Sequence, residues 1–455
     1  MNDYENKELA GILGRFERME ITGVSIDSRN IKKGELFVAI QGERFDGHDF
    51  VPDAMKKGAW GALVERTALE TRFSSLSGLR NILPVEDTLY ALQEMAFMHR
   101  KKFSIPVLGV TGSNGKTTTK EMLAQILKQR GPVLKNEGNL NNHLGVPLTL
   151  LKLSALHTSA VVEMGMSALK EIDTLARLIR PTVGVITNIG PAHLEFLGSL
   201  DAIAQAKGEL LDNLEPEGTA VLNADDAYCN QLKKKCTGKI VTFGIENKVD
   251  VRATAIQQSK NCTEFTLLAA GSKADVRLRV LGRHNVYNAL AAAAGALAIG
   301  MSLDAVKNGL NDFAPVAMRS EIRQLQDRTV LADYYNANPA SMEAALVTLM
   351  SLEPGAQTIA VLGDMLELGK TAEEAHRAVG AIAAKLGVSA VITIGALGKQ
   401  IAEGAIEAGM PKDRVLQTKT HEEAAELLHK LSRSGDAVLI KGSRGMKMEK
   451  ILEVF

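Results

Sequence analysis

Apolar and polar positions alternate along the chain in blocks that predict strands followed by helices. Short, continuous apolar runs at 105–110, 159–163 and 183–188 are typical of strands buried on both faces of a sheet. After the first run, residues 116–129 place Met122 and its apolar neighbours on one helical face. This alternation predicts a mainly parallel sheet covered by helices.

The pattern changes on both sides of this block. The first hundred residues alternate short strands, at 36–40 and 62–64, with turns and with helices at 53–57 and 88–99. In residues 250–281 apolar and polar positions alternate in three strand-like segments with no helix between them, which predicts an antiparallel edge of the sheet. Beyond Pro315 strands and helices alternate again. Strands are expected at 329–332, 358–362, 390–394, 414–416 and 437–440, and helices at 341–351, 372–385, 399–407 and 422–431.

A chain of 455 residues is long enough for about three domains. We predict an α/β fold made of a small N-terminal α/β domain at 1–102, a central domain at 103–315 and a C-terminal domain at 316–455. The central domain should be P-loop ATPase-like with a mainly parallel sheet. The C-terminal domain should be Rossmann-like and doubly wound.

Composition excludes several classes of protein. Lys and Arg number 53, as do Asp and Glu, so nucleic-acid binding by bulk charge is not expected. The three cysteines, Cys229, Cys236 and Cys262, form no CxxC pair and no zinc spacing, and we expect them to be structural.

Targeting signals are also not expected. The polar, acidic start lacks the basic and apolar regions of a signal peptide. The longest apolar run, Ala289–Met301, is too short for a bilayer, which needs ~20 residues. These features predict a cytoplasmic protein without stable membrane insertion.

The clearest chemical motif is TGSNGKTT at 111–118, between a strand and a helix. Backbone N–H groups in such a loop cradle phosphates, Lys116 can reach the β and γ phosphates, and the Thr117 hydroxyl can bind Mg²⁺. The full pattern would place glycine where Val110 stands, so this is a variant loop in which Gly112 supplies the turn. The ATP contacts expected here are Gly112, Ser113, Asn114, Gly115, Lys116, Thr117 and Thr118.

Three further polar residues are each open to two interpretations. Glu163 ends a strand beside the loop, where it is either a Mg²⁺ ligand or a surface acid. His193, in NIGPAH, is either a metal ligand or a structural hydrogen bonder. Lys207 lies on a helix, and the sequence alone favours a solvated lysine.

Later motifs also follow strands or open helices. Asn285, in GRHNVYN, is either a helix N-cap or a contact to an adenine edge. Arg319 stands at a domain junction, and Asp333 ends a strand. Loops beginning at Gly363 and Lys441 leave strands at their carboxyl ends, where doubly wound sheets bind ligands.

Together these motifs resemble the Mur ligase family of ATP-dependent amide-forming enzymes, over essentially the whole chain. The phosphate loop, Glu163, NIGPAH, GRHNVYN and Arg319 look like family-wide features. More specific are DYYNANPAS, GDMLELG and KGSRGMKME in the last third, with Asp27-Ser28-Arg29 and the segments 36–39 and 42–48 in the first.

The resemblance implies a ligase that joins D-alanyl-D-alanine to a UDP-N-acetylmuramoyl-tripeptide, in peptidoglycan precursor synthesis. The tripeptide carboxylate would attack the γ-phosphate of ATP, and the dipeptide amine would then attack the acyl phosphate. It further implies two Mg²⁺ ions, a carbamylated Lys207 and a monomer. Lys116, Lys207 and His193 would be catalytic, and Thr117, Glu163, His193 and Lys207 would hold metal.

The resemblance also assigns substrate contacts. It implies nucleotide contacts from Asn285, Asn288, Arg319 and Asp333, and a place near metal and phosphate for Asn139 and Asn142. The UDP-substrate contacts it implies are Ser28, Arg29, Gly42, Arg44, Phe45, Asp46, Gly47 and His48. Those to the dipeptide are Asn336, Asn338, Asp364 and Glu367.

Two alternatives remain at this level. A folate-type glutamate ligase would share the ATPase core but is not expected to carry residues 25–48. A non-catalytic nucleotide switch would not need Lys207, Arg319 and Asp333 from separate segments.

Because an acyl phosphate hydrolyses in water, we also expect the third domain to close on the second, with a hinge at 313–316 and Asp333 far from Lys116 before substrates bind.

Overall fold

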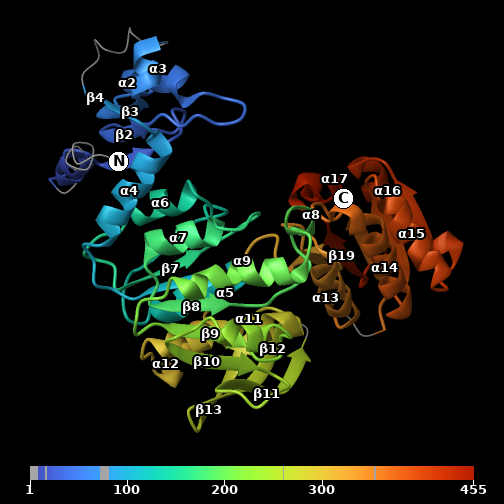
Figure 1. The fold of residues 1–455 in the computed structure, drawn as a ribbon. Helices are drawn as coiled ribbons and strands as arrows, with labels where there is room; N and C mark the ends of the chain where they lie inside the picture. The colour runs from blue at the N-terminus through green and yellow to red at the C-terminus, as the bar shows by residue number, and fades with distance from the viewer. Residues whose placement is uncertain (1–8, 16–17, 72–80, 260, 353–354) are drawn as a thin grey trace.

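Three sheets follow one another along the chain in the computed structural model, which describes residues 9–15, 18–71, 81–259, 261–352 and 355–455. Figure 1 shows them as a blue N-terminal part, a green to yellow central part and an orange to red C-terminal part. The predicted three-domain α/β fold is confirmed.

The N-terminal sheet has four parallel strands in the order β1-β2-β3-β4. Each strand is short, and helices connect the later ones, as parallel pairing requires. The strands are β1 (Gly23–Ser25), β2 (Glu35–Val38), β3 (Gly61–Glu65) and β4 (Ile82–Val85). The helices are η1 (Gly47–Phe50), α2 (Val51–Lys56), α3 (Arg66–Thr71) and α4 (Thr88–Arg100).

The central sheet has nine strands in the order β13-β12-β11-β10-β9-β8-β5-β7-β6. The predicted antiparallel edge is confirmed, because only β11-β12 and β12-β13 pair in that sense. The strands are β5 (Val107–Thr111), β6 (Val133–Lys135), β7 (Ser159–Glu163), β8 (Val183–Ile186), β9 (Thr219–Asn223), β10 (Lys239–Gly244), β11 (Val251–Ser259), β12 (Cys262–Ala269) and β13 (Ser272–Leu278).

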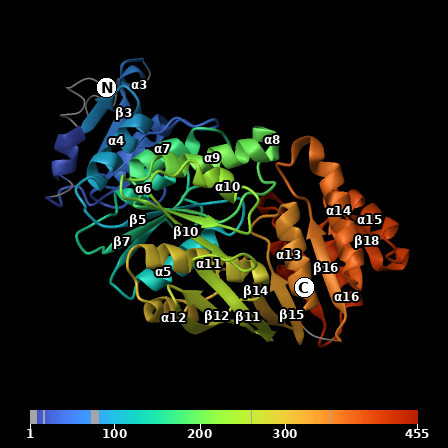
Figure 2. The ribbon, with the colours of Figure 1, turned by 60° about the horizontal axis from the view of Figure 1, so that its bottom comes forward.

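Helices cover both faces of this sheet (Figure 2). The alanine-rich α11 packs against α5 with the alanines from Ala289 to Ala294 fully buried, so the two helices lie close together. The helices are α5 (Lys116–Leu127), α6 (Gly145–Leu150), α7 (Glu171–Ile179), α8 (Leu194–Leu197), α9 (Leu200–Asp212), α10 (Cys229–Lys233), α11 (Arg283–Ala298) and α12 (Leu303–Asn311).

The third sheet has the order β14-β15-β19-β16-β17-β18. Its strands are β14 (Glu321–Leu325), β15 (Arg328–Ala332), β16 (Thr358–Gly363), β17 (Ala390–Ile394), β18 (Val415–Thr418) and β19 (Ala437–Lys441). Its helices are α13 (Pro339–Met350), η3 (Gly369–Thr371), α14 (Ala372–Lys385), α15 (Gly398–Glu407), η4 (Lys412–Arg414), α16 (His421–Leu431), η5 (Arg444–Met446) and α17 (Glu449–Val454). The antiparallel edge strand β14 was not predicted, because none of its side chains is fully buried and it lacks an apolar run.

The three parts are joined in different ways. One continuous apolar cluster runs from Leu36 and Leu63 of the N-terminal sheet through Leu92 of α4 to Leu175 and Leu211 of the central domain. The third sheet has separate clusters on its two faces. The first two domains therefore share a core, while the third has its own.

No helix in the described parts of the chain is long and apolar enough to cross a membrane.

Candidate functional site

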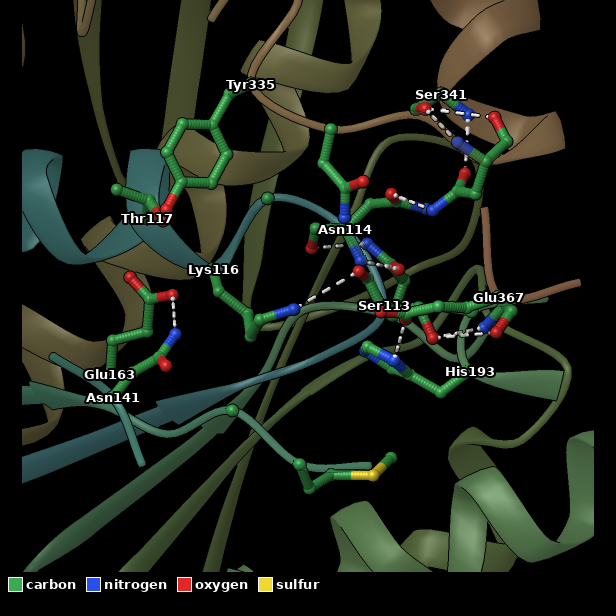
Figure 3. A pocket seen from close by; sticks show the side chains of 18 of the residues that line it. Ser113, Asn114, Lys116, Thr117, Asn141, Glu163, His193, Tyr335, Ser341 and Glu367 are labelled. Carbon is green, nitrogen blue, oxygen red and sulfur yellow. Dashed lines mark hydrogen bonds and ion pairs between the residues drawn. The ribbon is translucent and has the colours of Figure 1, made fainter. Parts of the chain in front are cut away.

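A cavity of about 1220 Å³ lies between the central and third domains. Residues at the carboxyl ends of β5, β7 and β8 face loops that follow β15, β16 and β19 across it (Figure 3). Most of the predicted site residues line it: Ser113, Asn114, Gly115, Lys116, Thr117, Thr118, Asn139, Asn142, Glu163, His193, Asn285, Asn288, Arg319, Asp333, Asn336, Asn338 and Glu367. Gly112, Lys207 and Asp364 are not among the lining residues.

Two glycines shape the phosphate loop. Gly112 and Gly115 have φ values of +149° and +78°, in the region that favours glycine. A Cβ on Gly112 would lie 1.9 Å from Thr187 Oγ1, and one on Gly115 would lie 2.0 Å from Asn288 Oδ1. The loop is therefore packed directly against the segment after β8 and against α11.

The segment after β8 holds the phosphate loop. Asn188 accepts from the backbone N–H of Ser113 at 2.9 Å and, through Oδ1, from that of Asn114 at 3.0 Å. The Ser113 hydroxyl donates to the Gly190 carbonyl and accepts from the Gly190 N–H, both at 2.8 Å. The first N–H groups of α5 remain available to an anion, as in other helix N-termini.

Lys116 is half-buried and folded back on its own loop. Its Nζ donates to the carbonyls of Gly112 at 2.8 Å and Ser113 at 3.3 Å. Burial lowers the pKa of Lys116, the Glu163 carboxylate counteracts this, and Arg319 lowers it further. The ammonium thus lies in the cavity with weak neutral partners that a phosphate can replace.

Glu163 ends β7 and is almost fully buried. Its Oε1 accepts from Asn141 Nδ2 at 2.8 Å, and its backbone N–H and carbonyl both bond the side chain of Asn136 at 2.9 Å. Its Oε2 accepts no hydrogen bond within the described structure, and Lys120 Nζ lies 3.8 Å away. Of the asparagine-rich stretch, Asn141 contacts Glu163, and Asn142 Oδ1 accepts from the N–H groups of Leu144 and Gly145 just before α6.

His193 meets the third domain. Its Nδ1 lies 2.7 Å from Glu367 Oε2, and both residues have left-handed backbones, with φ of 58° and 63°. The hydrogen bond with His193 lowers the pKa of Glu367. Next to it, the Glu195 N–H donates to the Glu367 carbonyl at 3.2 Å. In this arrangement Glu367 contacts the central domain.

Lys207 is on α9 with only 1% of its surface exposed, so the interpretation as a solvated lysine is wrong. Neither a hydrogen bond nor an ion pair joins its Nζ to another residue of the described structure. Burial lowers its pKa well below the ordinary value, and the charge of Lys116 adds to this effect. Both effects favour the neutral amine over the ammonium.

Asn285 and Asn288 lie at the start of α11, buried beside the phosphate loop. Asn285 Nδ2 donates to the Leu281 carbonyl at 2.7 Å, and Asn288 Nδ2 donates to Asn285 Oδ1 at 3.0 Å. Gly282 precedes the helix as its N-cap residue, so the N-cap interpretation of Asn285 is wrong.

On the third-domain side, Asp333 is held by a buried lysine. Lys441 Nζ donates to Asp333 Oδ2 at 2.6 Å, and Asp333 Oδ1 accepts from the Ser320 N–H at 3.0 Å. The Arg319 guanidinium stacks over the ring of Tyr335, 3.9 Å from its centroid. These contacts fix a carboxylate and a cation side by side on the cavity wall.

The third domain touches the phosphate loop itself. Asn338 Nδ2 donates to Asn114 Oδ1 at 2.7 Å, while Asn338 Oδ1 caps α13 through the Ser341 N–H. The two domains are thus in contact at the phosphate loop, while the expected separation of Asp333 from Lys116 stays a prediction. Asn336 is exposed on the cavity wall.

Asp364, expected near the dipeptide, lies behind the wall. Its carboxylate accepts from the N–H groups of Ala396 at 2.8 Å and Leu397 at 3.1 Å, after β17. Burial raises the pKa of Asp364, and these two donors counteract it. In this structure Asp364 shapes the loops around the cavity and does not line it.

The candidate UDP-substrate residues lie in the N-terminal domain, away from the cavity lining. His48 is buried and joins Asp46 Oδ1 at 2.6 Å to the Glu65 N–H at 2.9 Å. A Cβ on Gly47 would lie 2.5 Å from the Ile40 nitrogen. His48 and Gly47 thus fix the loop. The other expected contacts lie as follows: Gly42, Arg44 and Phe45 are exposed on the same loop, Arg29 is exposed and paired with Asp27, and Ser28 is buried with its carbonyl bonded to Lys57.

The donor set suits a magnesium ion better than a transition metal. Within the described ranges no three His, Cys, Asp or Glu side chains converge. Glu163 nevertheless offers a buried oxygen without a hydrogen bond beside Lys116 and Thr117 on the cavity wall. Mg²⁺ commonly takes one or two carboxylates and completes its shell with water and phosphate oxygens. The site fits that pattern.

Sequence comparison finds three family models along the chain. They are the Mur ligase family, catalytic domain at 20–100, the Mur ligase middle domain at 110–296, and the Mur ligase, glutamate ligase domain at 318–444. The UDP-N-acetylmuramoyl-tripeptide–D-alanyl-D-alanine ligase of Bacillus subtilis is 38% identical over 440 residues, covering 96% of this chain and 94% of its own. The Escherichia coli enzyme of the same name is 38% identical over 453 residues, covering 98% and 96%.

Solved structures agree with these relatives. A crystal structure of MurF from Acinetobacter baumannii matches with a TM-score of 0.86 and 34% identity, over 95% of this chain and 93% of that one. MurF ligase from Thermotoga maritima in complex with ADP matches with a TM-score of 0.84 and 28% identity, over 96% and 97%. The similarity thus extends over all three sheets.

Proposed function

Because the chain belongs to the Mur ligase family, we propose that it joins D-alanyl-D-alanine to a UDP-N-acetylmuramoyl-tripeptide at the expense of ATP. The observation that carries this proposal is the full-length similarity, at 38% identity, to two enzymes named for that reaction. The cavity supports it, because the phosphate loop and the third-domain loops line one space.

The chemistry has two steps. A carboxylate oxygen of the tripeptide attacks the γ-phosphorus of ATP, and the bond to the bridging oxygen breaks, releasing ADP. The dipeptide amine then attacks the carbonyl carbon of the acyl phosphate. Phosphate leaves, the amine loses a proton, and an amide remains. Such phosphoryl transfer depends on positioning and charge neutralisation.

The phosphate loop supplies much of the positioning and of the charge neutralisation. Lys116 would turn from the carbonyls of Gly112 and Ser113 to the β and γ phosphates, together with the free N–H groups of Thr117 and Thr118 at the start of α5. The bonds that Asn188 accepts and Gly190 donates keep the loop in shape, so the loop backbone needs no reorganisation when charge develops.

Residues for Mg²⁺ are at hand in the same wall. Glu163, His193 and the Thr117 hydroxyl would hold the ions, and Asn139 and Asn142 would lie close by. When bound, Mg²⁺ neutralises charge on the phosphates during transfer.

Lys207 would act as a carbamate. Burial and the charge of Lys116 lower its pKa and so favour the neutral amine, which can attack CO₂ and lose a proton. The product is an anion beside Lys116, in place of a buried lysine that has no ion-pair partner among the described residues. That anion would support a second Mg²⁺ ion. The residue's burial and depressed pKa favour this modification.

The remaining contacts divide among the domains. We propose boundaries at 1–102, 103–315 and 316–455, with the UDP end bound by the first domain through residues 28–29 and 42–48. Asn285 and Asn288 would contact adenine, and Arg319 and Asp333 would reach the nucleotide from the third domain. Asn336, Asn338 and Glu367 would contact the dipeptide, with Asp364 shaping the loops.

Both ATP and a UDP-linked peptide are intracellular metabolites, so we place the reaction in the cytoplasm, as a step of peptidoglycan precursor synthesis on which cell shape and division depend. We also propose that the enzyme acts as a monomer, because all the assigned contacts come from one chain. Sedimentation at working concentration tests this.

The decisive experiment measures phosphate release from ATP with both acceptors present, and with each left out. We expect release, and the pentapeptide product, only with both the UDP-N-acetylmuramoyl-tripeptide and D-Ala-D-Ala. Glutamate with a folate in their place tests the glutamate-ligase alternative. ATP hydrolysis indifferent to every acceptor would support the nucleotide switch and contradict the proposal.

A further inference from the structure

Three lysines of this chain rank among its largest fully buried side chains: Lys120, Lys207 and Lys441. The mechanism uses Lys207, and Lys441 holds Asp333. Lys120 has no role in it so far. It lies on α5, one turn beyond Lys116, and no surface of it is exposed.

The Lys120 ammonium lies between two acids and a carbonyl. Its Nζ donates to the Asn136 carbonyl at 2.7 Å and lies 3.2 Å from Glu121 Oε1 and 3.8 Å from Glu163 Oε2. Glu121 has a second cation, Lys135, at its other oxygen. Among the described residues, Lys120 is the one cation within 4.0 Å of the Glu163 carboxylate. Burial makes such charges costly unless they are paired.

Lys120 also reaches Glu163 through Asn136. The Asn136 side chain bonds both the backbone N–H and the backbone carbonyl of Glu163, each at 2.9 Å. Lys120 holds the carbonyl of that same asparagine. One ammonium therefore ties the phosphate-loop helix to the strand end that carries Glu163, and faces the oxygen that accepts no hydrogen bond.

We propose that Lys120 is a positioning residue for Glu163, which keeps that carboxylate aimed into the cavity so that Mg²⁺ can join the nucleotide there. It touches neither nucleotide nor substrate. This proposal rests on the proposed function in one respect, because it requires that a nucleotide binds in the cavity. It does not depend on which acceptors the enzyme joins.

The test is calorimetric binding of ADP with and without Mg²⁺, on the full chain. Lys120→Met keeps the length and apolar stem but removes the charge. We expect metal-free ADP binding unchanged and the Mg²⁺ concentration for half-maximal enhancement raised roughly 10- to 100-fold, the usual effect of losing a group that orients a metal ligand. Lys128→Met, at the exposed end of the same helix, is the matched control and should leave both values unchanged.

A double-mutant cycle distinguishes positioning from bulk stability. If Lys120 acts through Glu163, then adding Lys120→Met to Glu163→Gln should not raise the Mg²⁺ requirement further. Two results would overturn the proposal. One is a Mg²⁺ requirement that rises in the double variant by the product of the two single effects. The other is a loss of metal-free ADP binding in Lys120→Met as large as its loss of Mg²⁺-dependent binding. If Lys120→Met does not fold, Lys120→Gln, which keeps a donor toward Asn136, replaces it in the cycle. This binding test contains no acceptor substrate. A negative result would therefore contradict the role of Lys120 without bearing on which acceptors the enzyme joins.

Discussion

At the scale of single residues, the phosphate loop concentrates the charge on which transfer depends. Lys116 has only carbonyl partners, so its ammonium can move to a phosphate with little loss. Lys207, by contrast, is buried and has no ion-pair partner among the residues that the structure describes. The two lysines therefore have opposite expected functions, one as a cation and the other as the carrier of an anion.

Lys116→Ala should reduce the ligation rate on the order of 10³-fold, because one phosphate-clamping charge is lost from the transition state. The fold should persist, since the side chain bonds only its own loop. Steady-state phosphate release and circular dichroism measure the two effects, with Lys128→Ala as the control. A variant that keeps more than about a tenth of the rate would contradict the assignment.

Lys207→Ala should be nearly inactive, and added formate or acetate should restore part of the rate. The truncation leaves a hole where a small carboxylate can replace the carbamate. The ligation rate as a function of carboxylate concentration measures the rescue. Lys116→Ala is the control, because an anion cannot replace its missing cation. Normal activity of Lys207→Ala would show that no anion is needed there.

Local motifs were predictable from the sequence, but their partners were not. The loop at 111–118, Glu163 and His193 stand out in the sequence and all contribute to the cavity. Lys120 carried no signal, because Asn136 and Glu163 meet it only after three elements pack together. For the same reason the pairing of His193 with Glu367 could not be seen: the two lie in different domains.

At the scale of elements, strands buried on both faces were the most predictable, since a continuous apolar run has few other uses. The half-exposed β14 and the short β6 were missed because their apolar runs are weak.

Ends of strands proved to matter most for function. Beyond the end of β9, Asp225 joins the turn after β10 to α11, whose Tyr287 lines the cavity.

The Asp225 contacts predict a pH dependence. Burial alone would raise the pKa of this carboxyl, but N–H groups of Glu246, Ile245 and Asn247 and the Tyr287 hydroxyl outweigh it and lower the pKa from 3.8 to about 2. A folded pKa below the unfolded one stabilises the protein above about pH 4, and this stabilisation is lost as the pH falls toward 2.

Asp225→Asn should therefore lower stability near neutral pH by about 1 kcal/mol, a value reduced for solvent screening. Its thermal midpoint should approach that of the unaltered protein as the pH falls below 4. Calorimetry from pH 7 to pH 3 measures the difference. Asp250→Asn, an exposed acid bonded to Thr242 in the same sheet, is the control. If the difference in thermal midpoint between Asp225→Asn and the unaltered protein did not change with pH, the stabilising role of the Asp225 charge would be contradicted.

At the scale of the whole molecule, the third domain meets the central one through polar contacts. Asn338 with Asn114 and His193 with Glu367 join the two around the cavity. Such contacts can be exchanged with water at little cost, whereas the apolar core shared by the first two domains cannot. We therefore expect the third domain to swing as a unit to admit substrates and release product, with 313–316 as the hinge.

A reversible crosslink tests this motion. A Cβ on Gly369 would lie 3.4 Å from the Glu195 Cβ, within reach of a disulfide between α8 and the third domain. With Glu195→Cys and Gly369→Cys together, oxidation should remove most of the turnover and reduction should restore it, because the closed site cannot exchange ligands. Each single cysteine variant is the control. Full turnover in the oxidised double variant would exclude opening as a required step.

The core shared across the first two domains has a consequence for synthesis on the ribosome. Leu36, Val38 and Leu63 of the N-terminal sheet pack into a cluster that is completed only by Leu211 and Leu232. During translation, that cluster stays incomplete until about half of the polypeptide has emerged, although the sheet itself is the first to leave the exit tunnel. The nascent chain is therefore open to chaperones and proteases throughout that interval. The last domain, with apolar clusters of its own, is complete only once Met448 and Ile451 near the end of the chain have appeared.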